Sequence, residues 1–126
     1  MNKKNILFVG GGSEIALKIL GKLKKTDIHC LSRQKNKSYK KNYFVKNYSN
    51  FNLEKKFKQI NKKFDIIFIF NGIFEFSTLS LINEKNFLNE FTINFLTPLR
   101  IVKNLIQNKL LNKNSKIFFL SSKAAN

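Results

Sequence analysis

Residues 6–17 read ILFVGGGSEIAL, and this stretch decides the expected fold. The four apolar residues Ile6–Val9 predict a buried strand, and three glycines after them predict a tight turn. Apolar residues then recur at helical spacing as far as Leu23. A strand, a glycine turn and a helix N-terminus together direct unpaired backbone N–H groups and the positive end of a helix dipole toward an incoming phosphate. The segment therefore predicts a nucleotide site.

The glycine turn alone leaves a second interpretation open. No Gly-Lys-Ser/Thr follows it, so it is not a Walker loop, and Gly10, Gly12 and Leu17 break the spacing of a strict G-x-G-x-x-G. A glycine-rich turn that only joins a strand to a helix is the alternative. The rest of the chain has to decide between the two.

Length and composition predict one globular domain over residues 1–126. Hydrophobic residues make up 43% of the chain, with 14 phenylalanines, which argues against disorder. The apolar runs Ile6–Val9 and Ile66–Phe70 are too short for a signal peptide or a bilayer span, so no membrane partner is expected. A single cysteine, Cys30, allows no internal disulfide and fits a reducing cytoplasm. We expect a cytoplasmic protein.

The net charge of +17 suggests a nucleic-acid partner, but the type of basic residue argues against one. Lysines outnumber arginines 22 to 2 and are spread along the whole chain. Proteins that read nucleic-acid grooves or phosphates favour the planar donor fork of arginine. The sequence therefore predicts no nucleic-acid partner.

Apolar segments alternate with amphipathic ones along the chain. Strands are expected at 5–10, 28–31, 43–45, 66–70 and 116–120, and helical spacing at 14–25, 53–64 and 84–111, with a basic loop at 35–41. Pro98 should kink or split the last helical segment near Thr97. Short strands that are apolar on both faces, separated by amphipathic helices, predict an α/β fold with a doubly wound parallel sheet.

Four segments, residues 9–16, 65–72, 90–98 and 116–122, resemble motifs of the short-chain dehydrogenase/reductase family. The glycine turn resembles the family's Thr-Gly-x-x-x-Gly-x-Gly, with Glu14 and Ala16 in place of its second and third glycines. The resemblance implies a Rossmann-like sheet of order 3-2-1-4-5, truncated after the fifth strand, in a single NAD(P)-binding domain. It places cofactor contacts in the turn at Gly10, Gly12, Ser13, Glu14 and Ile15. We expect the Glu14 carboxylate to point to solvent, away from a pyrophosphate.

The resemblance also bears on the choice of cofactor. Ser32-Arg33 stands where the family discriminates between its two nicotinamide cofactors, and a neutral residue followed by arginine resembles the version that accepts a 2′-phosphate. NADP, rather than NAD, is the implied cofactor. The resemblance gives Asn47-Tyr48 a place against the adenine. It gives Asn71-Gly72 a place against a ribose, although only the glycine matches the family literally.

Two catalytic positions follow from the resemblance, and two others are missing. Asn94 matches the asparagine that holds a water in the family's proton relay, and Ser122 matches the serine that hydrogen-bonds the substrate carbonyl. The family's general acid is a tyrosine followed by lysine four residues on. None of the three tyrosines here has a lysine at that spacing, so the chain looks like the N-terminal half of a reductase.

The expected function is therefore NAD(P)-dependent hydride transfer between nicotinamide and the carbonyl or alcohol carbon of a small molecule. A full-length form is expected to be a homo-oligomer. The alternative is a non-catalytic nucleotide-binding or interaction module that keeps the cofactor cradle without turnover.

Overall fold

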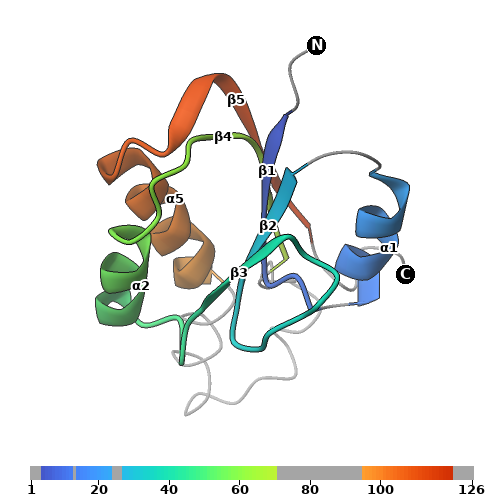
Figure 1. Ribbon diagram of the computed structural model, residues 1–126. Coiled ribbons are helices and arrows are strands. Elements are labelled where there is room, and N and C mark those ends of the chain that lie inside the picture. The colour runs from blue at the N-terminus through green and yellow to red at the C-terminus, as the bar shows by residue number, and fades with distance from the viewer. Residues whose placement is uncertain (1–3, 13, 24–26, 71–94, 121–126) are drawn as a thin grey trace, which may run out of the picture.

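The computed structural model describes residues 4–12, 14–23, 27–70 and 95–120, which form one parallel sheet with helices on both faces (Figure 1). The sheet has five strands in the order β3-β2-β1-β4-β5, and every pairing is parallel. This is the strand order that the sequence predicts. The strands are β1 (Asn5–Val9), β2 (Asp27–Ser32), β3 (Lys41–Phe44), β4 (Phe64–Ile69) and β5 (Leu111–Phe119). The helices are α1 (Glu14–Lys22), α2 (Asn50–Phe57) and α5 (Thr97–Gln107).

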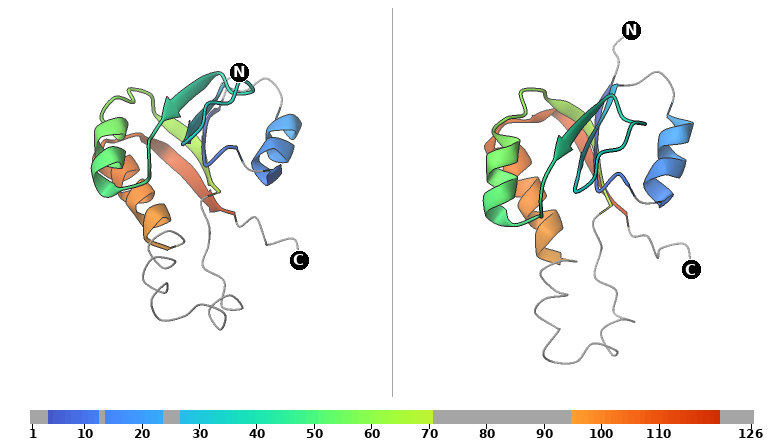
Figure 2. Two further views of the ribbon diagram at one scale, coloured as in Figure 1. Left: turned by 90° about the horizontal axis from the view of Figure 1, so that it is seen from below. Right: turned by 60° about the horizontal axis from the view of Figure 1, so that its bottom comes forward.

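Strand β1 lies at the centre of the sheet and is buried on both faces. Helix α1 covers one face, and α2 and α5 cover the other (Figures 1 and 2). Ile6 and Phe8 belong to the core cluster on the α1 side, whereas Leu7 and Val9 belong to the cluster beneath α2 and α5. All four side chains are at most 2% exposed. This two-sided burial explains why the strand is a continuous apolar run and not an alternating one.

The connection from β2 to β3 contains no helix, so a side chain covers the sheet there instead. Residues 33–40 form a loop, and Tyr39 from this loop is buried in the α1-side cluster. The Tyr39 ring packs edge-on against Phe8, with 5.6 Å between ring centroids. Its hydroxyl donates a hydrogen bond to the backbone carbonyl of Gly11, 2.6 Å away. Tyr39 thereby joins the β2–β3 loop to the glycine turn.

The Asp65 carboxylate connects the two neighbours of β4. One oxygen accepts a hydrogen bond from the Asn5 backbone N–H at 2.8 Å, and the other accepts one from Asn112 Nδ2 at 2.9 Å. Asn112 belongs to a bulge in β5, where the pairing of Phe64 with Leu111 is followed by the pairing of Ile66 with Lys116. The carboxylate therefore fixes the bulge against the start of β1.

The helical spacing expected at 53–64 is wrong beyond Phe57. Helix α2 begins after the N-cap Ser49 and ends at Phe57, and Phe64 is the first residue of β4. Leu53, Phe57 and Phe64 are all fully buried in the cluster beneath α2 and α5. The helical period arises by coincidence, because the helix, the loop and the next strand all contribute to the same core.

The long helical segment expected at 84–111 is also corrected. Among its described residues, α5 spans Thr97–Gln107 and residues 95–96 before it are π-helical. The helix ends at Gln107 because the chain reverses at Lys109 (φ 55°) and Leu111 begins β5. Pro98 lies in the first turn of α5, where its missing N–H costs no hydrogen bond. The kink or split predicted near Thr97 stays a prediction, because residues 84–94 lie outside the described part of the chain.

The other boundaries differ from the predictions by a few residues. Helix α1 ends at Lys22 rather than at residue 25. Strand β2 is longer by one residue at each end, β3 starts two residues earlier and ends one earlier, and β4 starts earlier by two. The largest change is in β5, which starts five residues before the predicted strand because its polar residues 112–115 form the bulge.

We predict that Gly11→Ala destabilises the protein by about 1–3 kcal/mol, the usual cost of overpacking a core. A Cβ at residue 11 would lie 2.6 Å from both Cys30 Sγ and the Tyr39 hydroxyl, and both of these side chains are buried. Gly21→Ala is the matched control, because nothing lies within 4 Å of its added Cβ. In a helix the control should raise stability by about 0.5–1 kcal/mol. Urea denaturation measures both, and equal stability of the two variants would contradict the packing described.

Strand β5 forms one edge of the sheet and carries exposed aromatic side chains there. It pairs with β4 on one side, and no partner strand lies on its other side among the described residues. Phe118 and Phe119, near its end, are each 43% exposed. Unpaired backbone groups beside exposed apolar side chains favour association between sheet edges.

We predict concentration-dependent association of the purified chain, reduced by Phe119→Lys. A charge at a sheet edge opposes edge-to-edge pairing. Phe51→Lys is the control, because Phe51 is 73% exposed on α2, away from this edge. Sedimentation velocity at several concentrations measures the association. A wild-type chain that stays monomeric, or an equal effect of both substitutions, would rule out association through the β5 edge.

Candidate dinucleotide site

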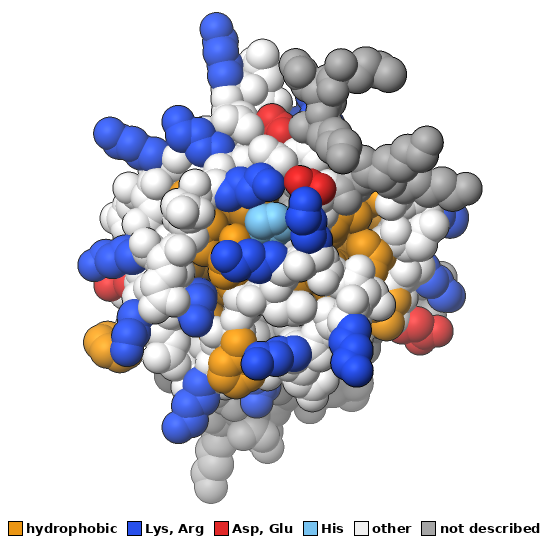
Figure 3. Space-filling model, in the orientation of Figure 1, with side chains coloured by type: hydrophobic (Ala, Val, Ile, Leu, Met, Phe, Trp, Pro, Cys, Tyr) orange, Lys and Arg blue, Asp and Glu red, His pale blue; other side chains and the backbone are white. Residues whose placement is uncertain are grey.

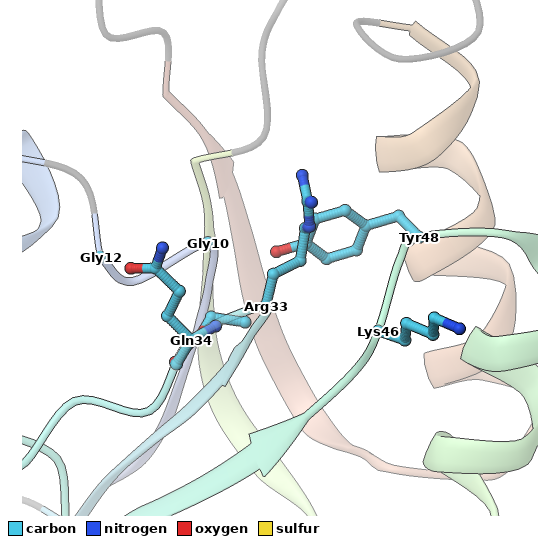
Figure 4. A pocket seen from close by; sticks show the side chains of 7 residues that line it. Gly10, Gly12, Arg33, Gln34, Lys46 and Tyr48 are labelled. Carbon is cyan, nitrogen blue, oxygen red and sulfur yellow. The ribbon is translucent and has the colours of Figure 1, made fainter.

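A cavity of about 320 Å³ opens at the carboxyl ends of β1, β2 and β3 (Figure 4). Its lining consists of Gly10, Gly12, Ser32, Arg33, Gln34, Lys46 and Tyr48. Parallel α/β sheets hold their ligands at this end of the strands. The volume lies at the lower end of the ~300–1,000 Å³ typical of small-molecule sites. The described residues therefore have room for one end of a dinucleotide rather than for all of it.

The three glycines of the turn serve three different purposes. Gly10 has a φ of 78°, a conformation that glycine adopts without strain, and its N–H donates to the Leu31 carbonyl at 2.8 Å. Gly11 is buried against Cys30 and Tyr39. Gly12 is exposed, and an added Cβ there would meet nothing within 4 Å. The chain thus leaves the sheet at Gly10, packs against the core at Gly11 and exposes its backbone to solvent at Gly12.

Ser32 shapes the turn that presents Arg33. Its side chain is almost fully buried, and its hydroxyl donates to the Gln34 carbonyl. The same oxygen accepts the Gln34 backbone N–H at 3.4 Å. This local pairing fixes the backbone between residues 32 and 34 and leaves the exposed Arg33 side chain to extend from it. The hydroxyl of Ser32 is thus engaged within the protein, although Ser32 lines the cavity.

The cavity is positively charged. Arg33 and Lys46 line it, and no carboxylate is among the described residues of its lining. Figure 4 shows Gln34 on the side of the glycine turn and Arg33 on the side of Tyr48, while Lys46 points away toward α2. The guanidinium of arginine can bind two oxygens of one phosphate through paired N–H groups. This lining suits a phosphate ester better than a free ribose hydroxyl, for which an acidic acceptor is typical.

Five of the cavity residues, Gly10, Gly12, Ser32, Arg33 and Tyr48, are among those singled out from the sequence. Gln34 and Lys46 are not. Lys46 stands directly before Asn47-Tyr48 at the end of a strand, which is the signal that could have found it. In a chain with 22 lysines that signal is weak.

Three of the predicted cofactor residues do not line the cavity. Glu14, the first residue of α1, is 89% exposed, as expected, and its carboxylate lies 3.9 Å from Lys18 Nζ. Ile15 packs against the α1-side core. The Asn47 side-chain oxygen accepts the Ser49 N–H at 3.0 Å and Asn52 Nδ2 at 2.6 Å, so it supports the start of α2.

Five predicted site residues lie outside the described part of the chain. They are the cofactor residues Ser13, Asn71 and Gly72 and the catalytic residues Asn94 and Ser122. Their assignments stay predictions.

His29 and Cys30 are parts of the core. His29 is 5% exposed, and its Nδ1 lies 3.0 Å from the Tyr43 hydroxyl. Burial, with a further contribution from Lys62, lowers the pKa of the imidazole. Burial raises the pKa of the Cys30 thiol, which disfavours the nucleophilic thiolate. Within residues 4–12, 14–23, 27–70 and 95–120, no cluster of three or more His, Cys, Asp or Glu residues could hold a metal ion. None of the described helices is long and apolar enough to span a membrane.

No protein-family model matches the sequence, and no curated protein matches it. Solved structures do match the fold. A short-chain dehydrogenase family protein from Francisella tularensis aligns with a TM-score of 0.72 at 20% identity, over 94% of this chain and 50% of its own. The ligand-free aldohexose dehydrogenase of Thermoplasma acidophilum aligns with a TM-score of 0.67 at 12% identity, over 85% of this chain and 44% of its own.

The chain has the fold of part of a short-chain dehydrogenase. It spans about half the length of these structures. MoeE5, which was solved in complex with UDP-glucose and NAD, aligns with a TM-score of 0.62 at 14% identity, over 95% of this chain and 37% of its own. At these identities the likeness establishes the fold, and the function has to be argued from the site.

Proposed function

We propose that this chain binds NADP(H) and forms the dinucleotide-binding part of a short-chain dehydrogenase/reductase. Such an oxidoreductase would act on a small carbonyl or alcohol substrate and, in a full-length form, would be a homo-oligomer. One observation carries the cofactor proposal: the glycine turn and Arg33 line one cavity at the carboxyl ends of β1–β3. The open backbone at Gly12 is where a pyrophosphate could approach, and Arg33 is the cation for a 2′-phosphate.

The residues present fit the adenosine end of this cofactor. Tyr48 offers a ring at the side of the cavity, and Arg33 offers positive charge without a competing carboxylate in the described lining. When bound, the nicotinamide supplies or accepts a hydride. What the chain's own residues do is hold the other end of the molecule and select the cofactor that carries the extra phosphate.

Proton transfer is the part of the reaction that these residues do not supply. Tyr39, Tyr43 and Tyr48 are followed four positions on by Tyr43, Asn47 and Asn52. Burial raises the pKa of both Tyr39 and Tyr43, which disfavours proton transfer near neutral pH. General acid catalysis typically contributes ~10²–10⁴-fold. These 126 residues should therefore reduce carbonyl compounds at close to the background rate.

The alternative is a nucleotide-binding or interaction module without turnover. Such a module would need the cavity and the sheet but no general acid. Both functions require the same cofactor site. They differ in whether a Tyr-x-x-x-Lys segment acts together with this chain.

The lysine distribution does not favour a nucleic acid as the partner. Figure 3 shows Lys and Arg side chains scattered over the face that carries β3. Some of these charges are paired, since Lys40 and Lys62 lie 3.1 and 3.5 Å from the Asp27 carboxylate. We therefore keep the small-molecule cofactor as the proposed ligand.

The proposal predicts tighter binding of NADP⁺ than of NAD⁺, by about tenfold or more, with the preference lost in Arg33→Ala. One good charge-assisted pair of hydrogen bonds is worth about 1.5–3 kcal/mol, and 1.4 kcal/mol corresponds to a factor of ten. Arg100→Ala is the matched control, since Arg100 is the other arginine of the chain and lies on α5. Titration calorimetry measures the affinities of the wild type and both variants for the two dinucleotides. Equal affinity of the wild type for both dinucleotides, or an equal effect of the two arginine substitutions, would contradict the proposal.

A further inference from the structure

Tyr39 is held in a single position by its surroundings. The side chain is 5% exposed, and the ring packs against Phe8 with its centroid 5.6 Å away. The hydroxyl donates to the Gly11 carbonyl at 2.6 Å. Burial raises the pKa of this phenol well above its ordinary value, so the group stays protonated and remains a donor.

The bond joins two segments that both line the cavity. Gly11 stands between Gly10 and Gly12, and Tyr39 belongs to the loop that begins with Arg33. Among the described residues, the Tyr39–Gly11 hydrogen bond is the one that connects loop 33–40 to turn 10–12. The other bonds of the loop run elsewhere: Asn36 pairs with Asn42, and the Lys40 N–H donates to the Ile28 carbonyl at 3.1 Å.

Packing acts in the same direction as the hydrogen bond. The space that a Cβ would need at Gly11 is filled by the Tyr39 hydroxyl and Cys30 Sγ, each 2.6 Å from the ideal Cβ position. The turn and the loop are therefore in van der Waals contact as well. A displacement of the loop would have to move the Gly11 carbonyl or break its hydrogen bond.

We propose that Tyr39 is a positioning residue that, together with the Gly10 N–H bond to the Leu31 carbonyl, holds the glycine turn against the loop that begins with Arg33 and so favours a ligand that contacts both. The inference rests on the proposed function, since it concerns how the same cavity holds NADP(H). A ligand with two anionic groups gains from this separation because the second contact is made without further ordering of the protein. A ligand that contacts only Arg33 gains nothing from it.

The test compares two ligands in the variant Tyr39→Phe. NADP⁺ spans the turn and the loop, whereas adenosine 2′-monophosphate carries the 2′-phosphate but no pyrophosphate. We expect Tyr39→Phe to weaken NADP⁺ binding by about 3–10-fold, the usual effect of one buried hydrogen bond. Binding of adenosine 2′-monophosphate should change by less than about twofold, because this ligand contacts Arg33 but not the glycine turn.

Tyr43→Phe is the matched control. It also removes a buried tyrosine hydroxyl, the one that lies 3.0 Å from His29 Nδ1, and this residue does not line the cavity. Both affinities should stay at the wild-type level in this variant. Its melting temperature, measured beside that of Tyr39→Phe, shows how much of any effect comes from stability alone.

The outcomes separate the two proposals. If the wild type binds neither ligand, the proposed function fails and the role of Tyr39 fails with it. If the wild type binds both ligands and Tyr39→Phe changes neither affinity, or weakens both equally, the positioning role alone is wrong.

Should Tyr39→Phe not fold, hydrogen exchange of the wild type gives the answer. NADP⁺ should protect the amides of residues 10–12 and 33–40 together. Protection of one segment without the other would overturn the inference.

Discussion

Burial of β1 on both faces is the constraint on which the rest of this structure depends. Parallel strands leave no face for water, so every crossover has to cover the sheet. Helices α1, α2 and α5 do so where they are present. Between β2 and β3 there is no helix, and the Tyr39 side chain covers Phe8 instead. This replacement requires that Gly11 have no side chain, because the tyrosine hydroxyl occupies the space that a Cβ would need.

The same constraint places the candidate site. The glycine turn and the Ser32–Gln34 turn both leave the sheet at its carboxyl edge, where neighbouring strands end side by side. Arg33 and the open backbone at Gly12 therefore line one cavity although they lie far apart in the sequence. The chemistry of the site follows from this placement and not from any unusual residue.

Most of the strands can be predicted from the sequence because both-sided burial leaves continuous apolar runs. The sheet order follows from the resemblance to the short-chain dehydrogenase/reductase family. The glycine turn is a local signal, and the resemblance to the family adds Ser32, Arg33 and Tyr48 to the cavity residues that the sequence predicts. The prediction fails at Phe64 and in the polar part of β5. The spacing of Phe64 from Leu53 and Phe57 matches that of a helix by coincidence. Residues 112–115 form a bulge that Asp65 holds in place. Nor could the sequence predict the bond from Tyr39 to Gly11, since that contact spans 28 residues and depends on a crossover without a helix.

The most direct test of the account is the map of amide chemical-shift changes when NADP⁺ is added to ¹⁵N-labelled protein. If NADP⁺ binds in the cavity, we expect the changed amides to cluster at the carboxyl ends of β1, β2 and β3. They should include Gly10, Gly12, Arg33, Gln34 and Tyr48. Changes confined to the lysines at the end of α2 and elsewhere on the surface, or no changes at all, would contradict it. Such a result would not affect the description of the fold, but it would show that NADP⁺ does not bind in this cavity.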